Sequence, residues 1–312
     1  MAQTDVEDVH KAHGVKPEAI SAIPLRHPGR WVAVGVIALF MAMGLHTVFT
    51  NPRFKWSLQW QYFFSAQILH GVTTTLELTV ASMAIGVTLG VILAVMRLSA
   101  NPIVTGAAWF YIWVFRGTPL LVQLLIWANL GALFPTLGLG VPFGHQFFVK
   151  QTFTIIPSVA AALLGLGLNE AAYMAEIVRA GIISVGEGQA EAAASIGMRK
   201  MMIMRRVVLP QAMRVIVPPT GNETISMLKS TSLVAYVPYV ELLFATQNIY
   251  TRNYQVMPLL IMASIWYLAI TSLLMVGQYY VERYYAKGSR RQLPLTPLQK
   301  VKAKVSKFGV RR

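Results

Sequence analysis

Long apolar runs separated by short polar segments make up most of the chain after residue 30. A helix needs about 20 consecutive apolar residues to cross a bilayer. Runs of this kind occupy residues 31–49, 72–96, 109–134, 153–178, 215–237 and 258–280. They predict an all-α, polytopic membrane protein with about six transmembrane helices.

Turn-forming and polar residues show where this pattern breaks. The sequence Arg-Gly-Thr-Pro at residues 116–119 interrupts the third run, which indicates either a broken helix that lines a cavity or a simple proline kink. Residues 136–151 are rich in glycine and proline, and we expect them to form an external loop. Residues 181–212 are polar with a helical period, so we place them outside the bilayer.

The chain therefore divides into segments along its length rather than into separately folded globular domains. Nothing outside the apolar runs is long enough to build a core of its own. The predicted segments are a cytoplasmic N-terminal arm (1–30), an extra transmembrane helix (31–50), an extracytoplasmic connection (51–70), a transmembrane domain (71–285) with a cytoplasmic loop (181–212), and a basic cytoplasmic tail (286–312).

Composition supports a membrane protein and excludes several other classes. Charged residues make up only 12% of the 312 positions, whereas soluble domains carry about a quarter. The net charge of +15 would suggest nucleic acid in a soluble protein, but here the basic residues flank apolar runs, so no nucleic-acid partner is expected. The chain has no cysteine, and its six histidines form no ligand pair, so we expect neither a catalytic site nor a metal site.

The distribution of Lys and Arg predicts the orientation, because cytoplasmic loops are enriched in these residues. With both termini in the cytoplasm, the external segments contain only Arg53, Lys55, Lys150 and Arg252. The tail alone contributes ten basic residues between positions 283 and 312. We interpret the tail as a topological anchor, with binding to anionic lipid headgroups as the alternative.

The loop between the fourth and fifth runs contains the most informative motif. Residues 191–196 favour a short helix, and Gly197 is a natural stop for it. An ordinary amphipathic surface helix is one interpretation. The other is that small alanine side chains let a second protein approach closely, while the basic cluster at 199–206 meets acidic groups.

The spacing of this motif resembles the "EAA" loop of ABC importer permeases. The matching positions are Glu191, Ala192, Ala193, Gly197, Val207, Leu209 and Pro210, with Val207 where isoleucine is usual. The resemblance implies that the loop, including Ser195, forms a coupling helix that docks on a cytoplasmic ATPase. It also implies a five-helix type I permease core, preceded here by one extra span.

Further motifs resemble the polar amino acid permeases of that family. They begin at Arg116, Ala172, Leu209, Asn222 and Leu228, and the resemblance extends over residues 71–283. Ser230 follows Lys229 where many relatives carry an acidic residue, so the pairing of Lys229 is open. The resemblance implies transport of polar amino acids or related compounds. Basic, acidic and amide amino acids, cystine and opines all fit.

Polar residues inside the predicted spans are candidates for a substrate pathway, because such residues usually face a cavity or a partner. Asn169, Tyr173 and Glu176 share one helix face. Together with residues from the motifs, the candidate set is Arg116, Gln123, Asn169, Tyr173, Glu176, Asn222, Glu223 and Lys229.

Structural roles are open for several of these residues. Glu176 could meet a substrate ammonium or pair with Arg179 three residues later. Glu223 and Lys229 could hold the two charges of a zwitterion or fix helix packing. Glu170 lies off the polar stripe, and we expect it to pack between helices.

The chain contains no phosphate-binding loop of the Gly-x-x-x-x-Gly-Lys-Ser/Thr type, so ATP and Mg²⁺ would belong to a separate ATPase. The resemblance implies two ABC ATPase subunits, an extracytoplasmic solute-binding protein and a second permease, identical or related, in the bacterial cytoplasmic (inner) membrane. An ion-coupled secondary amino acid transporter would need inverted repeats and ion ligands, and a membrane enzyme would need a catalytic constellation. We find neither in the sequence.

Overall fold

The computed structural model describes residues 28–141 and 145–285, which leaves out nearly all of the predicted arm and the whole tail. It divides into two compact units, residues 1–54 and 55–312, described here one at a time. The first contains α2 (Pro28–Thr50) and the 3-10 turn η1 (Pro52–Phe54). α2 is apolar on all sides and buries no residue of its most apolar window, as expected for a lipid-exposed span.

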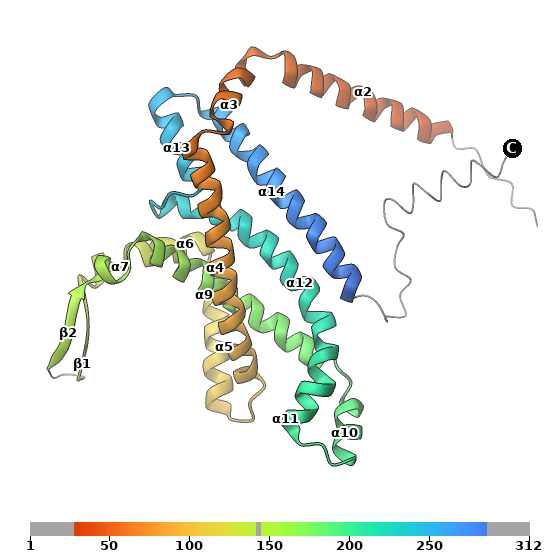
Figure 1. Cartoon of the computed structure of the whole chain (residues 1–312), viewed down its shortest axis with the longest axis vertical. Coiled ribbons are helices and arrows are strands. Elements are labelled where there is room, and N and C mark those ends of the chain that lie inside the picture. The colour runs from red at the N-terminus through yellow and green to blue at the C-terminus, as the bar shows by residue number, and fades with distance from the viewer. Residues whose placement is uncertain (1–27, 142–144, 286–312) are drawn as a thin grey trace, which may run out of the picture. The chain divides into compact units, whose positions relative to one another are not determined.

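Two long helices, α4 (Ala66–Arg97) and α9 (Ser158–Ile183), form the centre of the second unit and pack side by side (Figure 1). The chain enters α4 through the short helix α3 (Trp56–Phe63). The Ser65 side chain caps the first turn of α4, and Arg97 lies in its last turn, where a cation is favourable.

The third apolar run forms two helices instead of one. α5 (Pro102–Gly117) and α6 (Leu120–Ala128) are bent by 100° at the predicted break. Asn101 caps α5 by accepting a hydrogen bond from the backbone N–H of Ile103, and Pro102 provides a favourable first residue. The break is therefore a sharp change of direction and not a mild kink.

The segment predicted as an external loop contains regular structure. After α7 (Leu130–Leu133), the strands β1 (Thr136–Gly140) and β2 (Gln146–Gln151) pair as an antiparallel hairpin, and α8 (Thr152–Ile155) follows. Glycine and proline indicated a turn, but the apolar residues on both sides of that turn pair through their backbones. The expected loop therefore has a regular hairpin structure, which its composition did not predict.

The cytoplasmic loop and the remaining helices complete the second unit. They are α10 (Glu187–Ser195), α11 (Lys200–Ile203), the π turn η2 (Met204–Val208), α12 (Leu209–Ser230), the 3-10 turn η3 (Thr231–Tyr236), α13 (Leu242–Asn253) and α14 (Val256–Tyr285). In Figure 1, α10 and α11 lie at the end of the unit where α4 finishes, and α3 and α13 lie at the opposite end.

The number of apolar spans differs slightly from the six that we expected. Among the described residues, α2, α4, α9 and α14 are long and apolar enough to cross a membrane, and the bent pair of α5 and α6 makes a possible fifth. The predicted span at 215–237 corresponds to α12 and η3. Asn222, Glu223 and Lys229 lower the hydropathy of α12, although its 22 residues would extend about 33 Å.

Candidate functional site

The coupling loop is a short helix closed by a left-handed glycine. α10 ends at Ser195, and Gly197 follows with a φ of +83°. The backbone N–H of Gly197 donates to Ala194 at 2.9 Å, and that of Met198 donates to Ala193 at 3.2 Å. This is the hydrogen-bond pattern of a glycine-terminated helix, and it accounts for the predicted stop.

The predicted coupling residues divide into a packed set and an exposed set. Ala193 is buried against Ile203 and Val208, which attaches α10 to the base of the next helix. In contrast, Glu191, Ala192 and Ser195 are exposed. Ile196 is 80% exposed, which is unusual for a large aliphatic side chain and provides an apolar contact for a second protein.

Leu209 and Pro210 lie inside a continuous helical segment. Helical structure runs without a gap from Lys200 through the π turn to Ser230. A proline inside a helix removes the hydrogen bond to the carbonyl four residues earlier. The wider π turn immediately before Pro210 accommodates this loss, so the helix continues.

Two predicted pathway residues support the break between α5 and α6. The Gln123 side-chain amide donates to the carbonyls of Phe115 and Thr118, at 2.9 and 3.1 Å. The Asn169 amide donates to the same Phe115 carbonyl at 2.9 Å and to the Gln123 side-chain oxygen at 3.2 Å. Both side chains are buried, so their polarity satisfies backbone groups that the break leaves free.

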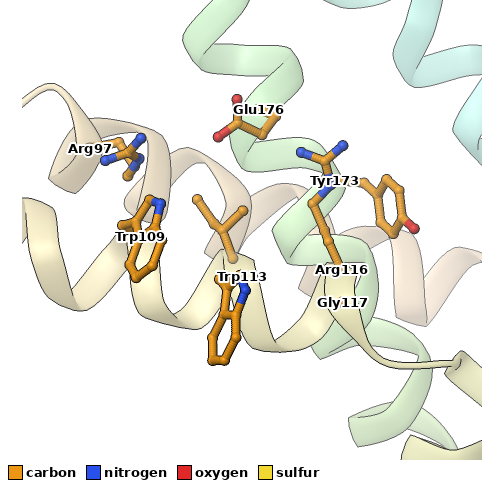
Figure 2. Close-up of a pocket in the computed structure, with 8 residues that line it drawn as sticks. Arg97, Trp109, Trp113, Arg116, Gly117, Tyr173 and Glu176 are labelled. Carbon is orange, nitrogen blue, oxygen red and sulfur yellow. The ribbon is translucent and has the colours of Figure 1, made fainter.

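Three other predicted residues lie together at an open groove of about 440 Å³. Figure 2 shows Arg116 beside Tyr173, with Glu176 on the same helix as Tyr173. The Arg116 guanidinium carbon lies 5.2 Å from the centre of the Tyr173 ring, a cation–π distance. Glu176 forms an ion pair with Arg179 at 2.8 Å, which is the pairing that one of its two interpretations expects.

The sequence analysis missed the rest of this groove. Arg97 from α4 and Trp109 and Trp113 from α5 line it too. The two tryptophan rings stack at 6.1 Å with an interplanar angle of 7°. Their spacing of four residues could have shown that the two tryptophans share one helix face. Arg97 gave no such signal, because a basic residue at the end of an apolar run is expected for topology alone.

The predicted residues of α12 form a polar face that the single chain leaves uncovered. Asn222, Ser226 and Lys229 are exposed and lie on one side of the helix, whereas Ile225 and Leu228 are buried. In a membrane helix, such a face must meet water or another protein, because lipid solvates these side chains poorly. Glu223 is half-buried next to this face.

A buried acid that was not among the candidates lies close to these residues. Glu170 of α9 is 4% exposed, and its Oε1 atom has no hydrogen-bond partner. Its side chain lies against Gly86 of α4, where any larger residue would overlap it. Glu170 interacts electrostatically with Glu223, and Glu223 interacts with Arg116. Glu223 of α12 therefore lies within electrostatic range of both Glu170 of α9 and Arg116 of α5.

A comparison with protein families identifies this arrangement. The model of the binding-protein-dependent transport system inner membrane component matches residues 86–287, from within α4 to just beyond α14. The chain belongs to this family. The matched part of the permease contains the α5–α6 break, the coupling loop and the polar face of α12.

Two curated relatives resemble this permease over most of its length. The arginine transport system permease protein ArgU of Corynebacterium glutamicum is 48% identical over 93% of this permease and 90% of its own chain. The nopaline transport system permease protein NocM of Agrobacterium fabrum is 39% identical over 66% of this permease and 82% of its own chain.

Solved structures of importers have the same fold. An amino acid ABC transporter crystallised with histidines is 36% identical, with a TM-score of 0.59, over 70% of this permease and 94% of that chain. The MetNI methionine ABC transporter, at 19% identity and a TM-score of 0.55, shares the fold.

These relationships give the general function of the protein. It is the membrane-spanning permease subunit of an ATP-driven ABC importer for amino acids, and a separate subunit carries the ATPase. The permease is therefore not itself an enzyme. Permeases of this kind work with ATPase and binding-protein partners. The relatives favour this function over that of an ion-coupled secondary transporter.

Proposed function

We propose that this permease imports a cationic amino acid along a route lined by Arg116, Tyr173 and the polar face of α12. The observation that carries the proposal is the position of Arg116. It contacts Tyr173 on α9 and lies within electrostatic range of Glu223 on α12, so a basic and an acidic group lie along one path.

The balance of charges supports a cationic side chain. A zwitterion needs one cationic partner for its carboxylate and one acceptor for its ammonium group, and a basic side chain needs a second acceptor. Arg97 and Arg116 at the groove suit the carboxylate. Glu223 provides a carboxylate outside the Glu176–Arg179 ion pair, and the side-chain oxygens of Asn222 and Ser226 on the exposed face of α12 provide further acceptors. The name of ArgU, an arginine transport system permease, agrees with this assignment.

The coupling residues attach the permease to its ATPase in this proposal. Glu191, Ala192, Ser195 and Ile196 form the exposed surface of the loop that docks on the ATPase. The buried residue Ala193 transmits the resulting movement to α12. Gly197, Leu209 and Pro210 maintain the shape of the loop.

The complete importer in this proposal has two permeases, two ATPases that each bind ATP with Mg²⁺, and an external solute-binding protein. The uncovered polar face of α12 supports a second permease chain, identical or related, on the other side of the route. Lys and Arg bias supports a bacterial cytoplasmic membrane location with both termini in the cytoplasm.

Uptake into proteoliposomes tests which amino acid the permease carries. Permease purified with its ATPase is supplied with binding protein outside, and uptake of labelled arginine, glutamine and glutamate is compared with and without ATP. We expect ATP-dependent uptake that favours arginine. Glu223→Gln should lower arginine uptake about tenfold through loss of one charge interaction. Glu18→Gln, in the N-terminal arm outside the residues that match the family, should have no effect.

Three results would contradict the proposal in different ways. Uptake that favours glutamate would exclude a cationic substrate. Unchanged arginine uptake by the Glu223→Gln variant would remove Glu223 from the route. Uptake that needs an ion gradient and no ATP would contradict the ABC mechanism itself.

A further inference from the structure

The coupling loop and the polar face of α12 belong to one uninterrupted helical segment. α11, η2 and α12 continue from Lys200 to Ser230. The base of this segment is held to the coupling helix through Ile203 and Val208, which pack on Ala193. Its other end carries Asn222, Glu223 and Lys229. A movement of the loop can therefore reach the route directly along the helix.

The middle of this helical segment is weakened by two successive prolines. Pro218 and Pro219 lie inside α12 and lack the N–H groups that would bond to the carbonyls of Arg214 and Val215. Helices bend at such positions, because both the hydrogen bonds and the steric fit of the preceding turn are lost. Pro218 and Pro219 therefore separate a loop-side half of α12 from a route-side half.

A side chain from α14 supports α12 at this weak point. The Gln278 side-chain amide donates to the Pro218 carbonyl at 2.7 Å and to the Glu282 carboxylate at 2.9 Å. It occupies the space that a side chain at position 221 would fill, because a Cβ atom on Gly221 would overlap the Gln278 amide oxygen. The contact requires both a glycine on α12 and an amide on α14.

Open space lies immediately beside this contact. A pocket of about 230 Å³ is lined by Gly221, Thr224 and Ile225 of α12 and by Leu273, Gly277 and Gln278 of α14. Closely packed helices resist relative movement. An open groove between α12 and α14, close in sequence to the two prolines, leaves room for α12 to shift against α14.

We propose that residues 218–221 form a hinge in α12, and that Gln278 is a positioning residue that sets the angle of the hinge. ATPase movement at the coupling loop then changes the orientation of the route-side half, and the Gln278 contact limits that change. The inference rests on the proposed placement of Asn222, Glu223 and Lys229 at the route. Gln278 touches no substrate in this mechanism and acts only through α12.

A set of variants tests the contact in the reconstituted importer. Gln278→Met keeps the size of the side chain but loses both donated hydrogen bonds, so we expect less substrate imported per ATP hydrolysed while ATP hydrolysis continues. A purely structural role would lower transport and hydrolysis together. The control is Ser264→Ala, also on α14, because among the described residues the Ser264 hydroxyl bonds to Leu260 of its own helix and to no neighbouring helix.

The second variant separates steric fit from hydrogen bonding. Gly221→Ala should displace Gln278 and uncouple transport from hydrolysis. The double variant Gly221→Ala/Gln278→Ala relieves the overlap but lacks the amide, and we expect it to stay uncoupled. Recovery of normal coupling by the double variant would overturn the role of Gln278.

Distance measurements test the hinge without altering it. The chain has no native cysteine, so spin labels attach only at engineered cysteines, here Gln211→Cys and Tyr236→Cys on either side of the hinge. We expect the distance between the labels to change between the nucleotide-free and ATP-bound importer. An unchanged distance in protein that imports substrate with ATP overturns the hinge. Absence of ATP-driven uptake in the unlabelled permease would instead count against the proposed function.

Discussion

Gly197 shows how one residue shapes the coupling loop. Its φ of +83° belongs to the left-handed region, and no neighbouring atom limits a side chain there. Backbone conformation, and not lack of space, therefore requires glycine at this position. The reversal that follows lets residues 198–203 return along α10 and bury Ala193.

The variant Gly197→Ala should destabilise the end of the coupling helix by about 1–2 kcal/mol, the cost of a left-handed conformation for a residue with a Cβ. We expect less ATPase to co-purify with the permease and a lower rate of ATP-driven uptake. Gly188→Ala is the matched control, since Gly188 lies inside α10 and has open space around it. If the same amount of ATPase co-purified with both variants, this account would be contradicted.

Single polar residues also show what the sequence could and could not predict. Spacing identified Asn169, Tyr173 and Glu176, and the motif that begins at Arg116 identified Gln123. Neither signal says whether a side chain faces a cavity or the backbone. Gln123 and Asn169 bond to carbonyls at the α5–α6 break, and Tyr173 lies at the groove. The difference arises from the 100° bend, which no local pattern specifies.

At the scale of elements, the Glu241 carboxylate helps to attach α13 to its neighbours. Glu241 is fully buried, caps α13 through the N–H groups of Leu243 and Phe244, and accepts a hydrogen bond from the Tyr267 hydroxyl at 2.7 Å. The Leu242 N–H also donates to the Thr75 hydroxyl. These bonds connect α13 to α14 and α4.

The variant Glu241→Ala should lower the free energy of unfolding by about 2–4 kcal/mol, from loss of the cap and of the buried hydrogen bond that Tyr267 donates to Glu241. A lower midpoint of thermal unfolding in detergent would reveal this effect. Thr251→Ala, an exposed substitution in the same helix, is the control and should change the midpoint little. Equal midpoints for the two variants would show that α13 is held by apolar contacts alone.

Prediction of the helices succeeded where an apolar run was long enough to span a bilayer. Apolar length identified α2, α4, α9 and α14 because a bilayer imposes it. The hairpin of β1 and β2 was missed because β2 follows no alternating pattern, and the two leucines that alternate with glycine in β1 make too short a run to predict a strand. The sequence does not predict that the helix continues through Pro210, because the π turn that accommodates the proline leaves no composition signal.

At the scale of the whole molecule, the bias of Lys and Arg predicts one orientation, which labelling can test directly. The variant Ser195→Cys, in α10, should react with a membrane-impermeant maleimide only after cells are permeabilised. Cysteine at Leu139, which is 74% exposed in the hairpin, should react in intact cells. The opposite pattern would invert the orientation and would place α10 out of reach of a cytoplasmic ATPase.

The uncovered polar face of α12 has a consequence for how cells make this permease. A chain that has not yet found its partner would present Asn222, Ser226 and Lys229 to lipid, at a cost that only assembly removes. Unassembled copies should therefore be recognised as faulty by membrane quality-control proteases. We expect synthesis of the chain without the rest of the importer to give short-lived protein, so that the abundance of the complex, and not the rate of translation, sets its level in the membrane.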